Sequence, residues 1–126
     1  MSPFFHAGVA ESGLIDYFNR LSAEVETALI LYNFPRHTQN PITARVLDAV
    51  NHYGIKDNTR DFSLATHTPH YFVGGDKHIT AAYKAGGFGF VSAQASHVPH
   101  PYVALEEALA AADVSSATYE IGRAHV

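Results

Sequence analysis

The chain contains no cysteine, which excludes disulfide bonds, thiolate nucleophiles and thiolate metal sites. Charged residues are scarce, at 16% of the 126 residues, and the formal net charge is −4. Because there is no basic run to meet phosphates, the sequence argues against nucleic acid as a partner. No apolar run approaches the ~20 residues of a membrane span and no secretory signal is visible, so we expect a cytoplasmic protein without a membrane partner.

Apolar residues are abundant, at 47%, and they alternate between helical stripes and short continuous runs. A stripe at Leu14, Phe18, Leu21 and Val25 predicts an amphipathic helix that begins after Ser12, which we take as its cap. Four short runs that stop at turn residues predict buried strands at 28–32, 53–56, 70–73 and 88–95. Helices are predicted between and after them, from the Thr43 cap with Val46, Leu47 and Val50 inward, then at 60–67, 77–85 and 100–112.

The order is therefore one helix followed by four strand–helix units, which implies βαβ connections and a parallel sheet. A repeat of about 20 to 25 residues is short for a doubly wound sheet and usual for a (β/α)8 barrel. We predict an α/β fold of the TIM-barrel type over residues 1–119. Residues 120–126 break the helical pattern and match one reading frame of a short sequencing adapter. We interpret them as an artefact of assembly, the alternative being a disordered natural tail.

Lys56 is the first candidate for chemistry because it ends the predicted strand 53–56. In a parallel barrel, side chains at the C-terminal ends of strands point into the mouth that carries the site. Partial burial there disfavours the charged form of a lysine, and a neutral amine can attack a ketone to form an imine. The alternative is a structural lysine paired with Asp57. The other two lysines, Lys77 and Lys84, fall on a predicted helix, where a solvated role is expected.

Tyr32 holds the equivalent place on the preceding strand. Sequential strands of a barrel are neighbours roughly 4.8 Å apart, so Tyr32 and Lys56 can face one small volume. A phenol beside an amine can act as a general acid and base. The alternative is a core tyrosine whose hydroxyl bonds to the backbone.

Short motifs at these strand ends resemble the dihydrodipicolinate synthase / N-acetylneuraminate lyase family. They are the sequences Tyr-Asn-Phe-Pro at 32–35, Gly-Ile-Lys-Asp at 54–57, Gly-Gly-Asp at 74–76, Gly-Phe-Val-Ser at 89–92 and Pro-Phe-Phe at 3–5. Each motif is short, but their order and spacing together are specific, and the resemblance runs from residue 3 to about 112. It implies that the chain is the C-terminal half of a TIM barrel, roughly its last four β/α units.

The resemblance also implies a chemistry. Lys56 would form a Schiff base with pyruvate or another 2-keto acid, Tyr32 would relay the proton, and the Gly75 and Val91 backbones would line the pyruvate pocket. It implies a small keto acid and an aldehyde as partners, no metal or organic cofactor, and assembly of the parent protein as a homotetramer. We count Asp76, in the third motif, among the substrate-binding candidates.

The chain departs from the family pattern at His37. Dihydrodipicolinate synthases have an arginine at this position, which binds the carboxylate of the aldehyde substrate. In this chain the arginine is one residue earlier, at Arg36. Both are therefore substrate-binding candidates, and Thr38 and Asn40 look nearer to the 2-keto-3-deoxy sugar acid aldolases. The alternatives are 4-hydroxy-tetrahydrodipicolinate synthase or a related dehydratase and, in another class, a non-catalytic α/β domain that binds a small molecule.

The family's carboxylate-binding Gly-Thr-Thr-Gly-Glu loop does not occur in this sequence. Four strands would also leave two open sheet edges and an uncovered inner face. We therefore expect this polypeptide alone to be inactive and poorly stable.

Nine histidines raise the possibility of a metal site. The pairs His67/His70 and His97/His100 lie in proline-containing loops without an acidic third ligand, so loop histidines are the favoured interpretation. Asp57, Asp61 and Asp76 are more simply explained by turn and cap roles.

Overall fold

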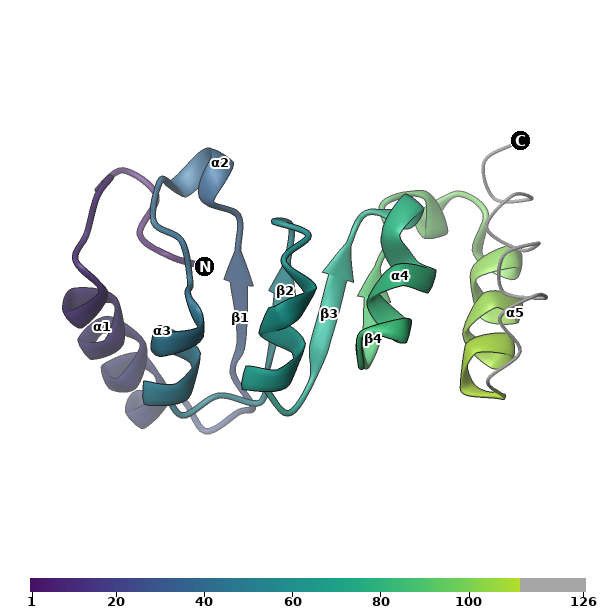
Figure 1. Ribbon diagram of the computed structural model, residues 1–126. Coiled ribbons are helices and arrows are strands. Elements are labelled where there is room, and N and C mark those ends of the chain that lie inside the picture. Colours follow the sequence, from purple (N-terminus) through teal and green to yellow (C-terminus); the bar gives the residue numbers. More distant parts are fainter. Residues whose placement is uncertain (112–126) are drawn as a thin grey trace.

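The computed structural model describes residues 1–111, which form one sheet of four strands and a series of helices (Figure 1). In chain order the elements are α1 (Glu11–Glu24), β1 (Ile30–Asn33), α2 (Pro35–Thr38), α3 (Ala44–Ala49), β2 (Gly54–Asp57), η1 (Phe62–His67), β3 (Tyr71–Gly74), η2 (Asp76–His78), α4 (Ile79–Lys84), β4 (Gly89–Val91), η3 (Gln94–Ser96) and α5 (Pro99–Ala110), where η denotes a 3-10 helix. The predicted alternation of strands and helices is confirmed.

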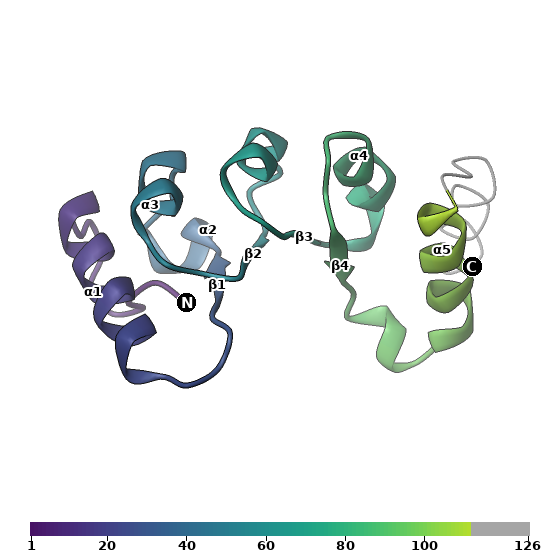
Figure 2. The same cartoon turned by 90° about the horizontal axis from the view of Figure 1, so that it is seen from below.

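The sheet is parallel throughout, in the order β1-β2-β3-β4. Its strands therefore run in one direction, and all their C-terminal ends lie at the same edge of the sheet (Figure 1). Seen from below, the sheet is an arc with α3 and α4 on one side of it (Figure 2). The register places Tyr32 beside Lys56, and Lys56 beside Phe72, in one row across β1, β2 and β3.

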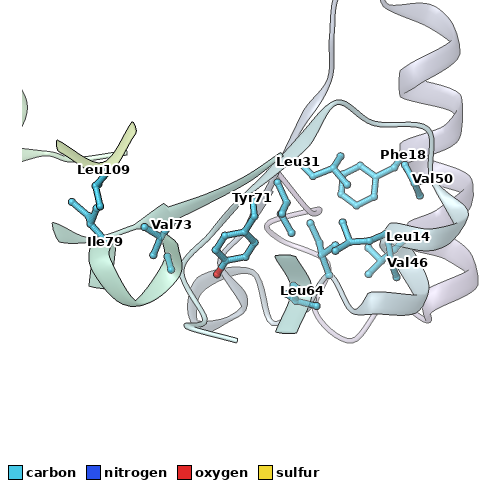
Figure 3. Close-up of a cluster of buried hydrophobic side chains, with 14 of the residues drawn as sticks. Leu14, Phe18, Leu31, Val46, Val50, Leu64, Tyr71, Val73, Ile79 and Leu109 are labelled. Carbon is cyan, nitrogen blue, oxygen red and sulfur yellow. The ribbon is translucent and has the colours of Figure 1, made fainter. Parts of the chain in front are cut away.

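The hydrophobic core lies between the sheet and the helices (Figure 3). Alternate strand residues point to this side and are fully buried, among them Leu31, Ile55, Tyr71 and Val73. Because side chains alternate along a strand, the residues between them face the other way. The helices contribute the remaining buried side chains, including Leu14, Phe18, Val46, Leu47, Ile79, Leu105 and Leu109.

The inner face of the sheet, which carries Tyr32, Lys56 and Phe72, is not covered by any element within residues 1–111 (Figure 2). Ile30 and Val91 on this face are 45% and 50% exposed. The expectation of an uncovered inner face is therefore confirmed for the described part of the chain. Apolar strand residues in contact with water forgo the free energy that burial would provide.

Three features of the first helix differ from prediction. The helix begins one residue before Ser12 and its N-cap is Ala10, with no side-chain cap bond, because Ser12 already lies inside the first turn. Leu21 is only half-buried, and Val25 lies beyond the helix end and is exposed. The predicted stripe is therefore correct at Leu14 and Phe18 but wrong at its C-terminal end, where the helix extends past the core.

The strand boundaries shift by one or two residues, and the last strand is much shorter than predicted. Only Gly89–Val91 pair with β3, and Gln94–Ser96 form a 3-10 turn because the Ser92 hydroxyl accepts hydrogen bonds from the Gln94 and Ala95 amides. The last helix begins at Pro99, one residue before its predicted start. The Thr43 cap is confirmed, since its hydroxyl accepts a bond from the Val46 amide. The predicted tail at 120–126 lies outside the described residues.

None of the helices within residues 1–111 combines the length and the apolar character needed to cross a bilayer.

Candidate active site

Lys56 and Tyr32 meet on the inner face of the sheet, as predicted. The Lys56 Nζ lies over the Tyr32 ring, 3.9 Å from the ring centroid, and both side chains are half-buried. The contact follows from the parallel register of β1 and β2, which sets the two residues side by side. Lys56 is thus neither in bulk water nor on the opposite side of the sheet from Tyr32, and it forms no ion pair with Asp57.

The face of an aromatic ring attracts a cation, so the contact with Tyr32 helps to hold the Lys56 side chain in this position. A lysine acts as a nucleophile only as the neutral amine. The Tyr32 ring in turn stacks on Phe34, at 5.8 Å between centroids and 25° between planes, which holds the phenol in place.

Gly74, at the end of β3, leaves room for the lysine side chain. A Cβ built on Gly74 would lie 2.9 Å from Lys56 Cε and would collide with Asn58 Oδ1. Only glycine fits at this position without a shift of its neighbours. Gly75 next to it has φ +98°, a conformation that favours glycine. Glycine is therefore needed at position 74 for space and favoured at position 75 for its backbone conformation.

A hollow of about 520 Å³ opens at the C-terminal ends of β2 and β3. Neither Lys56 nor Tyr32 lines it, but Gly74, which does, borders the Lys56 side chain. Its walls come from the loops that follow β1, β2 and β3. The lining residues are Phe34, Arg36, Asn58, Thr59, Arg60, Gly74, Gly75, Asp76, Lys77 and His78. This hollow therefore lies at the edge of the sheet where a barrel enzyme carries its site.

The predicted substrate-binding residues divide into two groups. Arg36, Gly75 and Asp76 line the hollow. His37 lies on α2 with its ring 4.3 Å from that of Phe34 and does not line the hollow. Val91 pairs with Gly74 through the backbone register but is half-exposed on the edge strand and does not line the hollow either.

Arg60, Lys77 and His78 also line the hollow, and none of them was among the predicted site residues. Lys77 is exposed, as predicted, and it lies in the 3-10 turn Asp76–His78 that leads out of β3 and precedes α4. Burial, and then the charges of Arg60 and Lys77, lower the pKa of His78. The sequence did offer one signal for these residues, because each lies within five residues after a predicted strand end.

Asp57 has a larger role than the predicted turn or cap. It lies on the core side of β2 and is completely buried. Its carboxylate accepts hydrogen bonds from Asn33 Nδ2 at 2.8 Å, from the Tyr71 hydroxyl at 2.8 Å, and from the Thr59 amide and hydroxyl at 3.1 and 2.7 Å. A buried carboxylate is tolerated only when it is bonded in this way. Asp57 therefore joins β1, β2 and β3 at the edge that carries the site.

The same carboxylate shapes the loop after β2. The Thr59 hydroxyl, bound to Asp57, accepts a bond from the Asp61 amide at 3.1 Å, and Asp61 accepts a bond from the Ser63 amide at 3.2 Å. Arg60 in the middle of this series has φ +69°, a left-handed conformation that costs free energy in a residue other than glycine. The loop that presents Arg60 to the hollow is thus held in one conformation by side-chain bonds.

The histidine pairs do not form a metal site within residues 1–111. His67 pairs with Asp48 at 2.9 Å, and His70 stacks on Tyr53 with ring centroids 4.1 Å apart. No three His, Cys, Asp or Glu side chains of this part of the chain converge on one point.

Known proteins match the chain over nearly its whole length. The model of the Dihydrodipicolinate synthetase family matches residues 1–123. A 4-hydroxy-tetrahydrodipicolinate synthase of Staphylococcus haemolyticus is 27% identical over 120 residues, which is 86% of this chain and 40% of that protein. YagE, a prophage protein of the dihydrodipicolinic acid synthase family from E. coli K12 solved in complex with pyruvate, superposes with a TM-score of 0.85 at 26% identity, over 97% of this chain and 46% of that one.

A further structure, the dihydrodipicolinate synthase of Aquifex aeolicus, superposes with a TM-score of 0.89 at 19% identity and covers 98% of this chain and 46% of that one. At that identity the likeness shows the fold alone. The chain thus spans less than half the length of these relatives. The predicted fold is confirmed: the chain is an open, partial TIM barrel.

Proposed function

Because the chain belongs to the dihydrodipicolinate synthetase family, we propose that it supplies the imine-forming half of a class I lyase, with Lys56 as the nucleophile. The substrates would be pyruvate or another 2-keto acid and an aldehyde, joined or released at one carbon–carbon bond. The observation that carries the proposal is the contact between Lys56 Nζ and the Tyr32 ring at the mouth of the partial barrel.

In the proposed reaction, the neutral amine of Lys56 attacks the keto carbon, the carbonyl oxygen leaves as water and an imine forms. The carbon next to the imine then loses a proton to give an enamine, and this carbon attacks the aldehyde. The reverse sequence breaks the same bond and releases the aldehyde. The protonated imine accepts the electron pair at each stage, so the proposed chemistry requires no metal or organic cofactor.

We assign Tyr32 the proton transfers. Its ring contacts Lys56 Nζ, and its hydroxyl is the proposed relay, which takes up the proton that the amine must lose while it passes its own proton on. Stacking on Phe34 limits the rotation of the phenol, which favours a fixed path for the proton.

Within this class we favour cleavage of a 2-keto-3-deoxy sugar acid, with 4-hydroxy-tetrahydrodipicolinate synthase or a related dehydratase as the alternative. His37 occupies the position at which the synthases have arginine, and its ring packs on Phe34 outside the hollow. Assembly as a homotetramer and a cytoplasmic location stay predictions.

We also propose that the 126-residue chain by itself is inactive and poorly stable. The support is the inner face of the sheet, where Ile30 and Val91 are half-exposed and Lys56 has no neighbour from a facing strand within residues 1–111. Measurable aldol cleavage by the purified chain would contradict this proposal.

The deciding experiment is trapping with pyruvate and borohydride, applied to the full-length gene product that contains this chain. Borohydride reduces an imine to a stable amine, so the mass of one reduced pyruvate should appear on the peptide that contains Lys56. Lys77 and Lys84 are internal controls and should stay unmodified. Absence of an adduct would contradict the lyase and support a non-catalytic domain that binds small molecules.

A further inference from the structure

The proposed catalytic pair Tyr32/Lys56 has a second pair of residues next to it, one position further along the same two strands. The register of β1 and β2 sets Asn33 beside Asp57, as it sets Tyr32 beside Lys56. Because side chains alternate along a strand, the two pairs face opposite sides of the sheet. Asn33 and Asp57 face the core, where they are 1% and 0% exposed.

A hydrogen bond between side chains joins β1 to β2 at this buried pair. Asn33 Nδ2 donates to Asp57 Oδ1 at 2.8 Å. The other carboxylate oxygen, Oδ2, accepts its bonds from the Tyr71 hydroxyl and from Thr59. Asn33 is therefore the donor to Oδ1, and its loss would leave one oxygen of a buried charge without a partner.

The Asn33 side chain also holds the chain that follows β1. Its Oδ1 accepts a bond from the Ile42 amide at 2.9 Å, and its Nδ2 contacts the Ile42 carbonyl at 3.4 Å. Phe34, the residue that follows Asn33, stacks on the ring of Tyr32, the residue that precedes it. The bonds of Asn33 thus fix the backbone between the two stacked rings.

The end of β1 depends on such a bond because β1 is the first strand of the sheet. Within residues 1–111 it pairs with β2 alone, and a backbone bond of 3.0 Å from the Asn58 amide to the Asn33 carbonyl closes this pairing. A slip by one residue would turn every side chain of the strand to the other face. The Asn33–Asp57 bond is specific for the observed register, in which Tyr32 faces Lys56.

We propose that Asn33 is a positioning residue for the proposed reaction. Through its bond to Asp57 on the core side, it sets the distance and angle between the Tyr32 phenol and the Lys56 amine on the inner side. The inference rests on the proposed function, in which a proton passes between these two groups. A misplacement of about 1 Å can slow such a step about a hundredfold.

The test is the rate of borohydride trapping with pyruvate, measured on the full-length gene product and expressed per folded molecule. Asn33→Ala should lower this rate at least about tenfold at neutral pH. The deficit should narrow as the pH rises from about 7 to about 9, because hydroxide then takes the proton from the amine without the relay. A rate per folded molecule equal to that of the wild type, or a deficit that does not change with pH, would overturn the proposal.

Tyr71→Phe is the matched control. It removes a bond to the same carboxylate, but from β3 and on the other oxygen, and leaves the bond between Asn33 and Asp57 in place. The variant should be less stable than the wild type, yet its trapping rate per folded molecule should stay within about twofold. Equal losses of rate in Tyr71→Phe and Asn33→Ala would overturn the assignment to Asn33.

Exchanging the two side chains provides a rescue. Asn33→Asp alone sets two carboxylates against each other and should slow trapping, as Asn33→Ala does. With Asp57→Asn added, the amide at position 57 can donate to the carboxylate at position 33, while its oxygen still accepts from Tyr71 and Thr59. Because only the 3.4 Å contact with the Ile42 carbonyl is lost, most of the rate should return. A double variant as slow as Asn33→Asp would contradict the proposal, and this comparison also serves if Asn33→Ala does not fold.

The Tyr32→Phe background shows whether Asn33 acts through the Tyr32 hydroxyl. With that hydroxyl removed, Asn33→Ala should lower the trapping rate by less than about a further twofold. Losses that multiply in full would overturn the proposal. If wild-type full-length protein forms no adduct at all, the lyase itself is contradicted, whereas a normal adduct in the wild type and in the Asn33 variants overturns the positioning role alone.

Discussion

The hydroxyl of Tyr71 donates a hydrogen bond of 2.8 Å to the buried carboxylate of Asp57. The bond crosses from β3 to β2 at the sheet edge that carries the candidate site. Burial, and then the bond to Asp57 and its charge, raise the pKa of Tyr71 well above its ordinary value of 10.0. The Tyr71 hydroxyl therefore stays protonated, and donates this bond, at neutral pH.

Tyr71→Phe should destabilise the chain, because it removes one of the four hydrogen bonds to a buried charge. We expect a loss of about 1.5–3 kcal/mol in the free energy of unfolding, measured by urea denaturation. Tyr83→Phe is the control, since the Tyr83 hydroxyl bonds only to the exposed Phe88 carbonyl. Equal losses of unfolding free energy in the two variants would show that the bond from Tyr71 to Asp57 stabilises the chain no more than an exposed hydrogen bond does.

Arg60→Gly should stabilise the chain by roughly 1 kcal/mol, because glycine adopts φ +69° without the steric cost. Arg60→Ala keeps that cost and should give no gain. The midpoints of thermal unfolding of the two variants measure the difference. A lower midpoint for Arg60→Gly would mean that the arginine side chain contributes to folding.

Tyr32→Phe should keep the fold and slow catalysis. Phenylalanine retains the ring that contacts Lys56 Nζ and Phe34 but lacks the hydroxyl assigned to proton transfer. In the full-length gene product we expect kcat to fall about 10²- to 10⁴-fold. The unfolding midpoint should stay within error of the wild type, and an unchanged kcat would remove Tyr32 from the mechanism.

Gly74→Ala should impair imine formation, because the added methyl group would displace both Lys56 Cε and Asn58 Oδ1. We expect the rate of borohydride trapping with pyruvate to fall at least about tenfold. Gly75→Ala is the comparison: a Cβ there meets no atom within 4 Å, but φ +98° makes it strained. Gly75→Ala should therefore lower the free energy of unfolding, while the rate of trapping by the folded protein should change less than in Gly74→Ala.

The titration of His78 should report the charges around the hollow. Burial and the positive charges of Arg60 and Lys77 lower its pKa below the ordinary 6.5, so Arg60→Gln should raise it. Lys84→Gln, which removes a charge outside the hollow, should leave it unchanged, as measured by the pH dependence of the His78 ring signals in NMR.

The lowered pKa of His78 also determines the direction in which the stability of the chain changes with pH. Between the lowered pKa and 6.5 the unfolded chain binds more protons at His78 than the folded chain does, so this contribution to stability is complete above pH 6.5 and lost as the pH falls. Stability that rises on acidification through this range in wild type, but not in His78→Gln, would contradict the assignment.

The sequence by itself determined the order of the elements and the pair Lys56/Tyr32. Short apolar runs bounded by turn residues mark buried strands, and the parallel order then makes neighbours of residues at equivalent strand ends. Both inferences need only local periodicity and one topological rule. The positions of Ser12 and Val25 were misjudged because a helix end depends on where the core stops, which a local pattern does not contain.

Only the tertiary structure decided the second half of the site. Arg60, Lys77 and His78 are ordinary polar residues in the sequence, and Asp57 has the appearance of a turn residue. Their roles depend on loops that meet only after β1, β2 and β3 have paired, and on the side chain at Asp57 facing the core instead of solvent. The physical reason is that periodicity is a property of one segment, whereas charge convergence and buried hydrogen bonding arise between segments far apart in the chain.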